Sequence, residues 1–184
     1  MPALKSHRIV QGDHEYELEL GLDDAAIMHE AVRFEITARS RHRAEDHWNE
    51  HKASVDLDFE GERPVARVTI EGHDPIEIDL GMVDISPGAS FEDAWEAIRD
   101  ACEGSAFEQL VMAFPADPVI GCLLKAGIST SIGQAIGCYR ETEHAKGLRT
   151  RVRRTLSCLG ENLPGMLFTA TARTLKCMVM LGFG

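Results

Sequence analysis

The spacing of apolar residues changes once along this chain of 184 residues, and that change limits the fold more than any other feature. In the first part, apolar residues alternate with charged ones, as in 15–20, 32–39 and 55–60. Alternation with a period of two is typical of a strand with one apolar and one polar face. From Ser86 onward the apolar residues recur at helical spacing. Strands followed by helices predict an α+β fold.

The strands are expected to form an N-terminal antiparallel β meander of about five strands, at 16–20, 32–39, 55–60, 65–70 and 75–80. Arg33 and Arg39 fall on the charged face, where they can pair with acidic residues of neighbouring strands. Residues 22–31 fit either a short helix or a loop. A C-terminal all-helical layer should cover the apolar face, because a sheet with one charged face is covered on one side only.

Helices are predicted at 91–102, 105–114, 118–126, 129–141, 145–159 and 164–181. Ser90 with Asp93 is a plausible N-cap pair for the first helix. The length predicts a single domain over 1–184 in two layers, an acidic β-rich part (1–85) and a helical part (86–184) that is basic and apolar from 105. The stretch 118–139 reads as a buried helical hairpin rather than a membrane span.

Charge divides the chain near Gly104, with 25 acidic and 10 basic residues before it and 5 acidic and 9 basic residues after it. The net charge of −11 argues against free association with nucleic acid or an anionic membrane, since both are bound by clustered Lys and Arg. Residues 1–11 show no apolar run of the kind found in signal peptides. The five cysteines include no CxxC pair, which predicts reduced core thiols and a cytoplasmic location.

The strongest local signal for chemistry is His47-x-x-Glu50-His51. On a helix, His47 and His51 would lie on one face and could share a zinc ion, with Glu50 as a possible catalytic base for a metal-bound water. A third ligand would have to come from a loop, and the candidates are His73, Asp74, Asp13 and His14. The alternative interpretation is a solvated connection between two strands.

A second signal is the basic run that contains Arg149, Arg151, Arg153 and Arg154. Such a helix could bind a phosphate, a carboxylate ligand or nucleic acid. No aromatic residues are interleaved with these arginines, which weakens a single-strand binding model and leaves nucleic acid an unlikely partner. Pairing with an acidic protein surface, in this chain or in another, explains the run equally well.

A third signal is the glycine-rich and hydroxyl-rich segment 127–137, which could start a helix that binds an anion through Ser129 or Thr130. Close approach between helices explains its small residues more simply. The apolar residues near the C-terminus exceed what one covering layer needs, which suggests a second helical layer or a contact with another subunit. They are Met166, Leu167, Phe168, Met178, Val179, Met180, Leu181 and Phe183.

Three hypotheses of function follow. The first is a non-catalytic cytoplasmic interaction or assembly protein, acting as a homo-oligomer or as a subunit of a larger complex and needing no cofactor. The second is a small metal-dependent hydrolase with zinc at His47 and His51 and Glu50 as its base. The third is a module that binds an anionic ligand or nucleic acid through Arg149, Arg151, Arg153 and Arg154.

Overall fold

The computed structural model describes residues 3–23, 31–58, 64–86, 88–142 and 144–182. Its strands are β1 (Ala3–Gln11), β2 (His14–Asp23), β3 (Ala31–His42), β4 (Asn49–Asp58), β5 (Val65–Ile70) and β6 (Ile76–Asp79). The helices are the short 3₁₀ helix η2 (Leu80–Met82), then α1 (Phe91–Ala101), α2 (Ala106–Ala113), α3 (Pro118–Glu141) and α4 (Leu148–Met180). Strands precede helices, so the predicted α+β class is confirmed.

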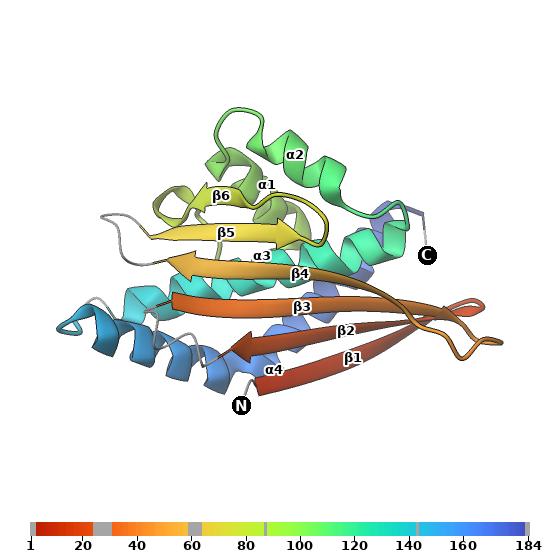
Figure 1. Cartoon of the computed structure of the whole chain (residues 1–184), viewed down its shortest axis with the longest axis horizontal. Coiled ribbons are helices and arrows are strands. Elements are labelled where there is room, and N and C mark those ends of the chain that lie inside the picture. The colour runs from red at the N-terminus through yellow and green to blue at the C-terminus, as the bar shows by residue number, and fades with distance from the viewer. Residues whose placement is uncertain (1–2, 24–30, 59–63, 87, 143, 183–184) are drawn as a thin grey trace.

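The six strands form one antiparallel sheet in the order β1-β2-β3-β4-β5-β6, and the helices lie on one of its faces (Figure 1). The meander therefore has one strand more than predicted. The additional strand, β1, is an edge strand, and among its side chains from Ser6 to Gln11 only Ile9 is buried. A strand with so little buried surface shows no clear alternation, which is why its sequence does not reveal it.

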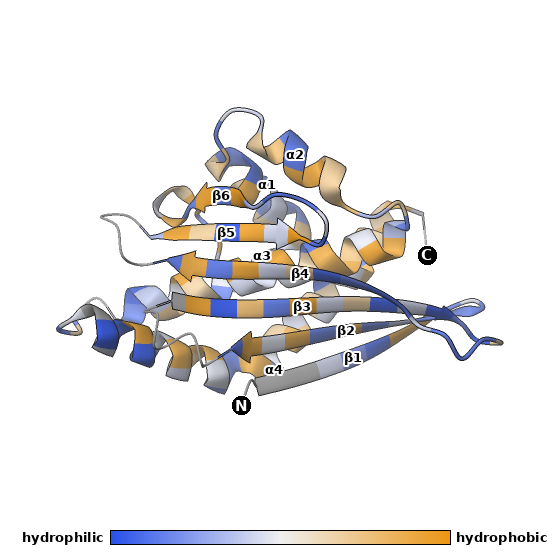
Figure 2. Ribbon diagram, viewed as in Figure 1, coloured by the Kyte–Doolittle hydropathy of each residue, from blue (hydrophilic) through white to orange (hydrophobic). Residues whose placement is uncertain are grey.

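The core lies between the sheet and the long helices α3 and α4. Alternate residues of the central strands point into it, and Phe34, Ile36 and Leu57 have no exposed surface. Figure 2 shows the matching alternation of apolar and polar residues along the strands. The charged residues between them form the other face of the sheet, which no described helix covers (Figure 1). Strict alternation thus produces one core face and one open face.

The helix α3 runs without interruption through Gly127, where the sequence predicted a break between two helices of a hairpin. The glycine lets the helix approach β3, because a Cβ atom at Gly127 would lie 2.8 Å from Ile36 Cγ2. Among described helices, α3 is the one long and apolar enough to cross a membrane, and 89% of its most apolar window is buried. The prediction that this stretch is buried holds, although it forms one helix.

The two helices predicted at 145–159 and 164–181 are also a single helix, α4, which contains Pro164. Proline removes one backbone hydrogen bond from a helix and crowds the preceding turn. The turns on either side are nevertheless held by burial of Leu159, Leu163 and Met166. The first helix begins as predicted, with Ser90 Oγ accepting the Asp93 N–H. Most of the ambiguous stretch 22–31 lies outside the described residues; Leu22 and Asp23 end β2.

Candidate functional site

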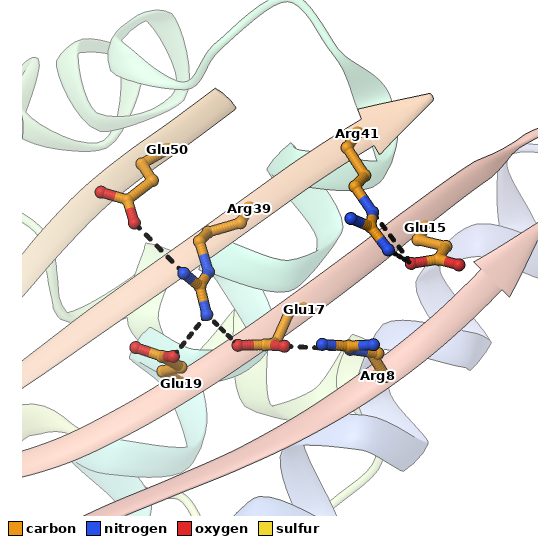
Figure 3. Close-up of polar contacts among 7 residues, drawn as sticks. All are labelled: Arg8, Glu15, Glu17, Glu19, Arg39, Arg41 and Glu50. Carbon is orange, nitrogen blue, oxygen red and sulfur yellow. Dashed lines mark hydrogen bonds and ion pairs between the residues drawn. The ribbon is translucent and has the colours of Figure 1, made fainter. Parts of the chain in front are cut away.

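A network of ion pairs on the open face of the sheet is centred on Arg39 of β3. The register places Arg39 directly opposite Glu17 on β2 and Glu50 on β4. Arg39 Nη2 donates to Glu17 and, at 2.7 Å, to Glu19, while Nη1 donates to Glu50 at 3.4 Å (Figure 3). One guanidinium therefore joins three carboxylates on two neighbouring strands. The prediction that the charged residues of this strand pair with acidic neighbours is confirmed.

The same cross-strand pairing continues on both sides of Arg39. Arg8 on β1 lies opposite Glu17 and donates to its carboxylate at 3.1 Å, and Arg41 lies opposite Glu15 and donates to it at 3.0 Å (Figure 3). Directly opposed charges on adjacent strands are the arrangement that stabilises a sheet face. The network thus links β1, β2, β3 and β4 through side chains as well as through the backbone.

Trp48, just before β4, lies against the cationic members of this network. The guanidinium carbons of Arg8, Arg39 and Arg41 lie 5.5, 5.4 and 4.7 Å from the centre of its ring. Cations at this distance are attracted to the face of an indole ring. Trp48 therefore anchors the connection between β3 and β4 to the open face of the sheet.

The surroundings shift the pKa values of two neighbouring carboxyls in opposite directions. Burial by itself raises the pKa of Glu17, but hydrogen bonds from Arg39 and Arg8 outweigh it and hold that pKa below its usual value. Burial raises the pKa of Glu19, and the hydrogen bond to Glu17 raises it further. Arg39 therefore stabilises the charged form of Glu17 more than that of Glu19. The charged groups of the network are thus paired with one another, although Arg39 Nε is buried without a hydrogen-bond partner in the part of the chain that the structure describes.

The residues of the predicted metal site do not share a helix face. His47 lies in the connection that precedes β4, whereas Glu50 and His51 are strand residues. Successive strand residues point to opposite faces, so Glu50 lies on the open face with Arg39 while His51 lies on the helix side. The helical spacing on which the zinc hypothesis depended is therefore wrong, because Glu50 and His51 leave the strand on opposite faces.

His47, Glu50 and His51 nevertheless all border one surface hollow of about 610 Å³, which Ser40, Trp48, Asn49 and Asp117 also line. Among the described residues, no three His, Cys, Asp or Glu side chains are grouped so that they could hold a metal ion. Of the loop residues considered as third ligands, none lines this hollow. His73 and Asp74 line a different one, beside α2. His14, instead, packs its ring against His42.

The basic run forms the first turns of α4, and the structure divides its members. Arg151 is held inside the chain, with its guanidinium 3.7 Å from the centre of the Tyr139 ring and Nε donating to Thr142 Oγ1 at 3.0 Å. Arg149, Arg153 and Arg154 are exposed. Three of the four arginines are thus available to a partner, and the fourth fastens α4 to the end of α3.

The glycine-rich segment 127–137 lies in the middle of α3 and does not start a helix. Ser129 and Thr130 are buried and accept hydrogen bonds from Arg173 Nη1 of α4, at 3.4 and 3.2 Å. Because their backbone amides belong to the interior of a helix, the anion-binding interpretation is wrong. The glycines do pack closely, but not against a helix as predicted. A Cβ at Gly127 would lie 2.8 Å from Ile36 of β3, and one at Gly133 would lie 3.2 Å from Ile85, between η2 and α1.

Four of the five cysteines form two disulfides, Cys122–Cys177 and Cys138–Cys158, and each joins α3 to α4 with its Cα atoms 5.7 Å apart. The prediction of reduced thiols is wrong for these four. The partners are 55 and 20 residues apart in sequence, so only the antiparallel packing of the two helices brings them together. Cys102 keeps a free thiol, whose pKa is raised by burial and by the nearby Glu108.

An apolar seam on α4 consists of Phe168, Ala172, Leu175 and Val179, and it faces solvent. The three larger side chains leave 78%, 47% and 57% of their surface exposed. Met166 and Met178, which the sequence analysis placed in the same apolar group, are buried, and Leu167 is half-buried. Met180 and Leu181 are exposed at the end of the helix, and Phe183 lies outside the described residues. The predicted surplus of apolar surface is thus divided between this seam and the end of α4.

Sequence reasoning missed two charged residues in the helical layer. Arg173 is buried, and its guanidinium donates to Ala89 O at 2.9 and 3.2 Å as well as to α3. Lys125 Nζ lies 5.7 and 5.3 Å from the ring centres of Trp95 and Phe114, and burial lowers its pKa. Arg173 and Lys125 each interrupt an apolar stretch of the sequence, and that interruption could have indicated a buried charged group. Both tie helices together rather than forming a site.

Comparison of the chain with protein-family models, with curated proteins and with solved structures finds no match. Its function is therefore argued from its own residues.

Proposed function

We propose that this protein is a non-catalytic interaction or assembly protein, which works as a homo-oligomer or as a subunit of a larger complex. The observation that carries the proposal is the apolar seam of α4. Three large apolar side chains at helical spacing leave between 47% and 78% of their surface in water. Contiguous exposed apolar surface of this kind is typical of a face that another chain covers.

The charged groups of the open sheet face support the same proposal. Arg39 forms ion pairs with three carboxylates of the same chain, and pairing across strands stabilises the sheet. Catalytic centres, by contrast, hold a group whose charge or proton is needed by a substrate. The ion-pair network therefore fits a structural role, and the proposed binding surface is the seam of α4.

Native mass spectrometry of the purified protein tests the proposal, because one spectrum reports subunit number and retained metal together. A defined oligomer at the apoprotein mass is the expected result. A monomer that carries one zinc ion per chain would overturn the proposal in favour of the metal-dependent hydrolase. A monomer at apoprotein mass across the range from 1 to 100 µM would contradict the homo-oligomeric form of the proposal.

Anion binding at the start of α4 is a second candidate function. Gly147 precedes the helix and provides no side-chain cap for its first N–H groups, and the first turn carries Arg149 in place of an acidic residue. A helix start normally favours negative charge, so added cations there favour an anion. Titration with a fluorescent single-stranded oligonucleotide at 50 and 200 mM salt tests this. Binding that weakens steeply with salt supports the candidate, and absent or salt-independent binding removes it.

The disulfides bear on the proposed cytoplasmic location. Disulfides persist mainly in oxidising compartments and are rare in the cytosol, where thiols are kept reduced. The part of the localisation prediction that rested on reduced cysteines therefore loses its basis. Electrophoresis of protein taken from its native source, with free thiols blocked at lysis, tests the location. Oxidised Cys122–Cys177 and Cys138–Cys158 would argue against the cytosol, and four reduced thiols would support it.

A further inference from the structure

The apolar seam of α4 points away from α3, because another face of the helix is bonded to α3. Arg173 donates to α3, and Cys177 is bonded to Cys122 of α3. Leu175 and Val179 follow these two residues by two positions each, which is about 200° around a helix. The seam therefore lies on the side of α4 opposite α3, where it is free to meet another chain.

The seam has the spacing of a helix-pairing surface. Phe168, Ala172, Leu175 and Val179 follow one another at intervals of four, three and four residues. Intervals of three and four that alternate are the pattern of helices that pack along their length. Gly165, three residues before Phe168, extends the same line and has nothing within 4 Å of where its Cβ would lie. The line from 165 to 179 is about 21 Å long.

A second copy of this chain fits the seam better than a charged partner does. On α4 between 162 and 182, the only charged residues are Arg173, which is buried, and Lys176, which lies 3.9 Å from Glu92. Two seams can therefore meet without opposing like charges. The exposed side chains offer on the order of 500 Å² per chain, and about 1,000 Å² for a pair is the lower limit for a specific interface.

The seam is also complementary to itself when two helices run antiparallel. With a two-fold axis at Ala172, the small Ala172 meets its own copy and lets the helices approach closely. Val179 then faces the partner's Gly165, so a large residue meets a small one. Phe168 lies next to the partner's Leu175. These two side chains fill the space on either side of the central alanine pair.

We propose that two copies of this chain pair antiparallel through the apolar seam of α4, about a two-fold axis near Ala172. This inference rests on the proposed function, association, and names its partner and its surface. Because the contact is apolar and each chain carries a net charge of −11, added salt screens the repulsion between copies and strengthens the dimer.

Sedimentation velocity from 1 to 100 µM measures the dimer in the wild type and in two matched variants. Phe168→Glu places a charge in the centre of the seam and is expected to weaken the dimer at least 100-fold. Met112→Glu on α2 makes the same change at a side chain that is 82% exposed outside the seam, and it should leave the dimer intact. Far-UV circular dichroism and urea unfolding verify that the variants fold. If Phe168→Glu fails to fold, Val179→Glu replaces it.

Cross-linking tests the position of the axis. In a Cys102→Ser background, Ala172→Cys is expected to form a disulfide between two chains under mild oxidation. Glu161→Cys should not, because two copies of residue 161 would lie about 33 Å apart along the paired helices. A cross-link at 161 without one at 172 would overturn the antiparallel arrangement.

The outcomes separate this inference from the proposed function. A wild-type oligomer that persists in Phe168→Glu, and that gives no cross-link at 172, overturns the contact through α4 while the assembly function stands. A wild-type monomer at every concentration overturns both the inference and the homo-oligomeric function. A monomer that binds vesicles of phosphatidylcholine and phosphatidylserine, and loses that binding in Phe168→Glu, assigns the seam to a membrane and overturns the dimer.

Discussion

Replacement of Gly127 by alanine tests the packing of α3 on the sheet. The new Cβ would lie 2.8 Å from Ile36 Cγ2, whereas carbon atoms in good contact lie about 3.5–4.0 Å apart. Ile36 has no exposed surface and lies in the middle of β3, so it cannot move aside. Overpacking of a core costs about 1–3 kcal/mol, and alanine stabilises a helix by about 1 kcal/mol relative to glycine. We therefore expect Gly127→Ala to lower the free energy of unfolding by up to about 2 kcal/mol.

Gly121→Ala is the matched control in the same helix, because a Cβ there meets nothing within 4 Å. It should raise the free energy of unfolding by about 0.5–1 kcal/mol. Urea unfolding followed by circular dichroism measures both. The cost of Ile36→Ala should be at least about 1 kcal/mol smaller when Gly127→Ala is also present, since the new methyl group enters the space that Ile36 leaves. If Gly127→Ala stabilises the protein as much as Gly121→Ala does, the close approach described here is refuted.

Three further predictions concern other parts of the fold. Glu17→Gln should lower the free energy of unfolding by about 1–3 kcal/mol at pH 7. That difference should be fully present above pH 4.5, the ordinary pKa of a Glu side chain, and should be lost as the pH falls from there through the lowered pKa of Glu17. Urea unfolding at pH 7, 4.5 and 3 measures it, and a difference independent of pH would contradict the ion pair. Cys138→Ser combined with Cys158→Ser opens a loop of 20 residues and should cost about 3 kcal/mol in chemical unfolding; a cost below about 1 kcal/mol would count against the bridge. Asp117→Ala removes the acceptor of two N–H groups at the start of α3 and should cost about 1 kcal/mol by thermal unfolding, whereas an unchanged midpoint would show that the cap contributes nothing.

The sheet was predictable where each strand buries one face. In β3, Val32, Phe34 and Ile36 are buried between charged residues, and such a pattern has no other regular interpretation. The edge strand β1 lacked that signal because it contributes few side chains to the core. The continuity of α3 and α4 was missed because glycine and proline usually end helices. At Gly127, tertiary packing overrides that preference.

The candidate site was less predictable, because its geometry depends on register and on distant parts of the chain. Glu50 and His51 were assigned to one side of a helix, and a strand places them on opposite faces. Arg39 was expected to pair with acidic residues, but only the register identifies Glu17 and Glu50 as those opposite it. The disulfides depend on the packing of α3 against α4, and no local pattern in the sequence reports that packing.

The two disulfides are nested, because the span from 138 to 158 lies wholly inside the span from 122 to 177. The exposed basic residues Arg140, in the last turn of α3, and Lys146, in the connection between α3 and α4, both fall inside both loops. A protease that cuts after either residue therefore releases no fragment, since both bridges still hold the two pieces together. The nicked protein would migrate at full mass without reductant and separate into two fragments once the bridges are reduced.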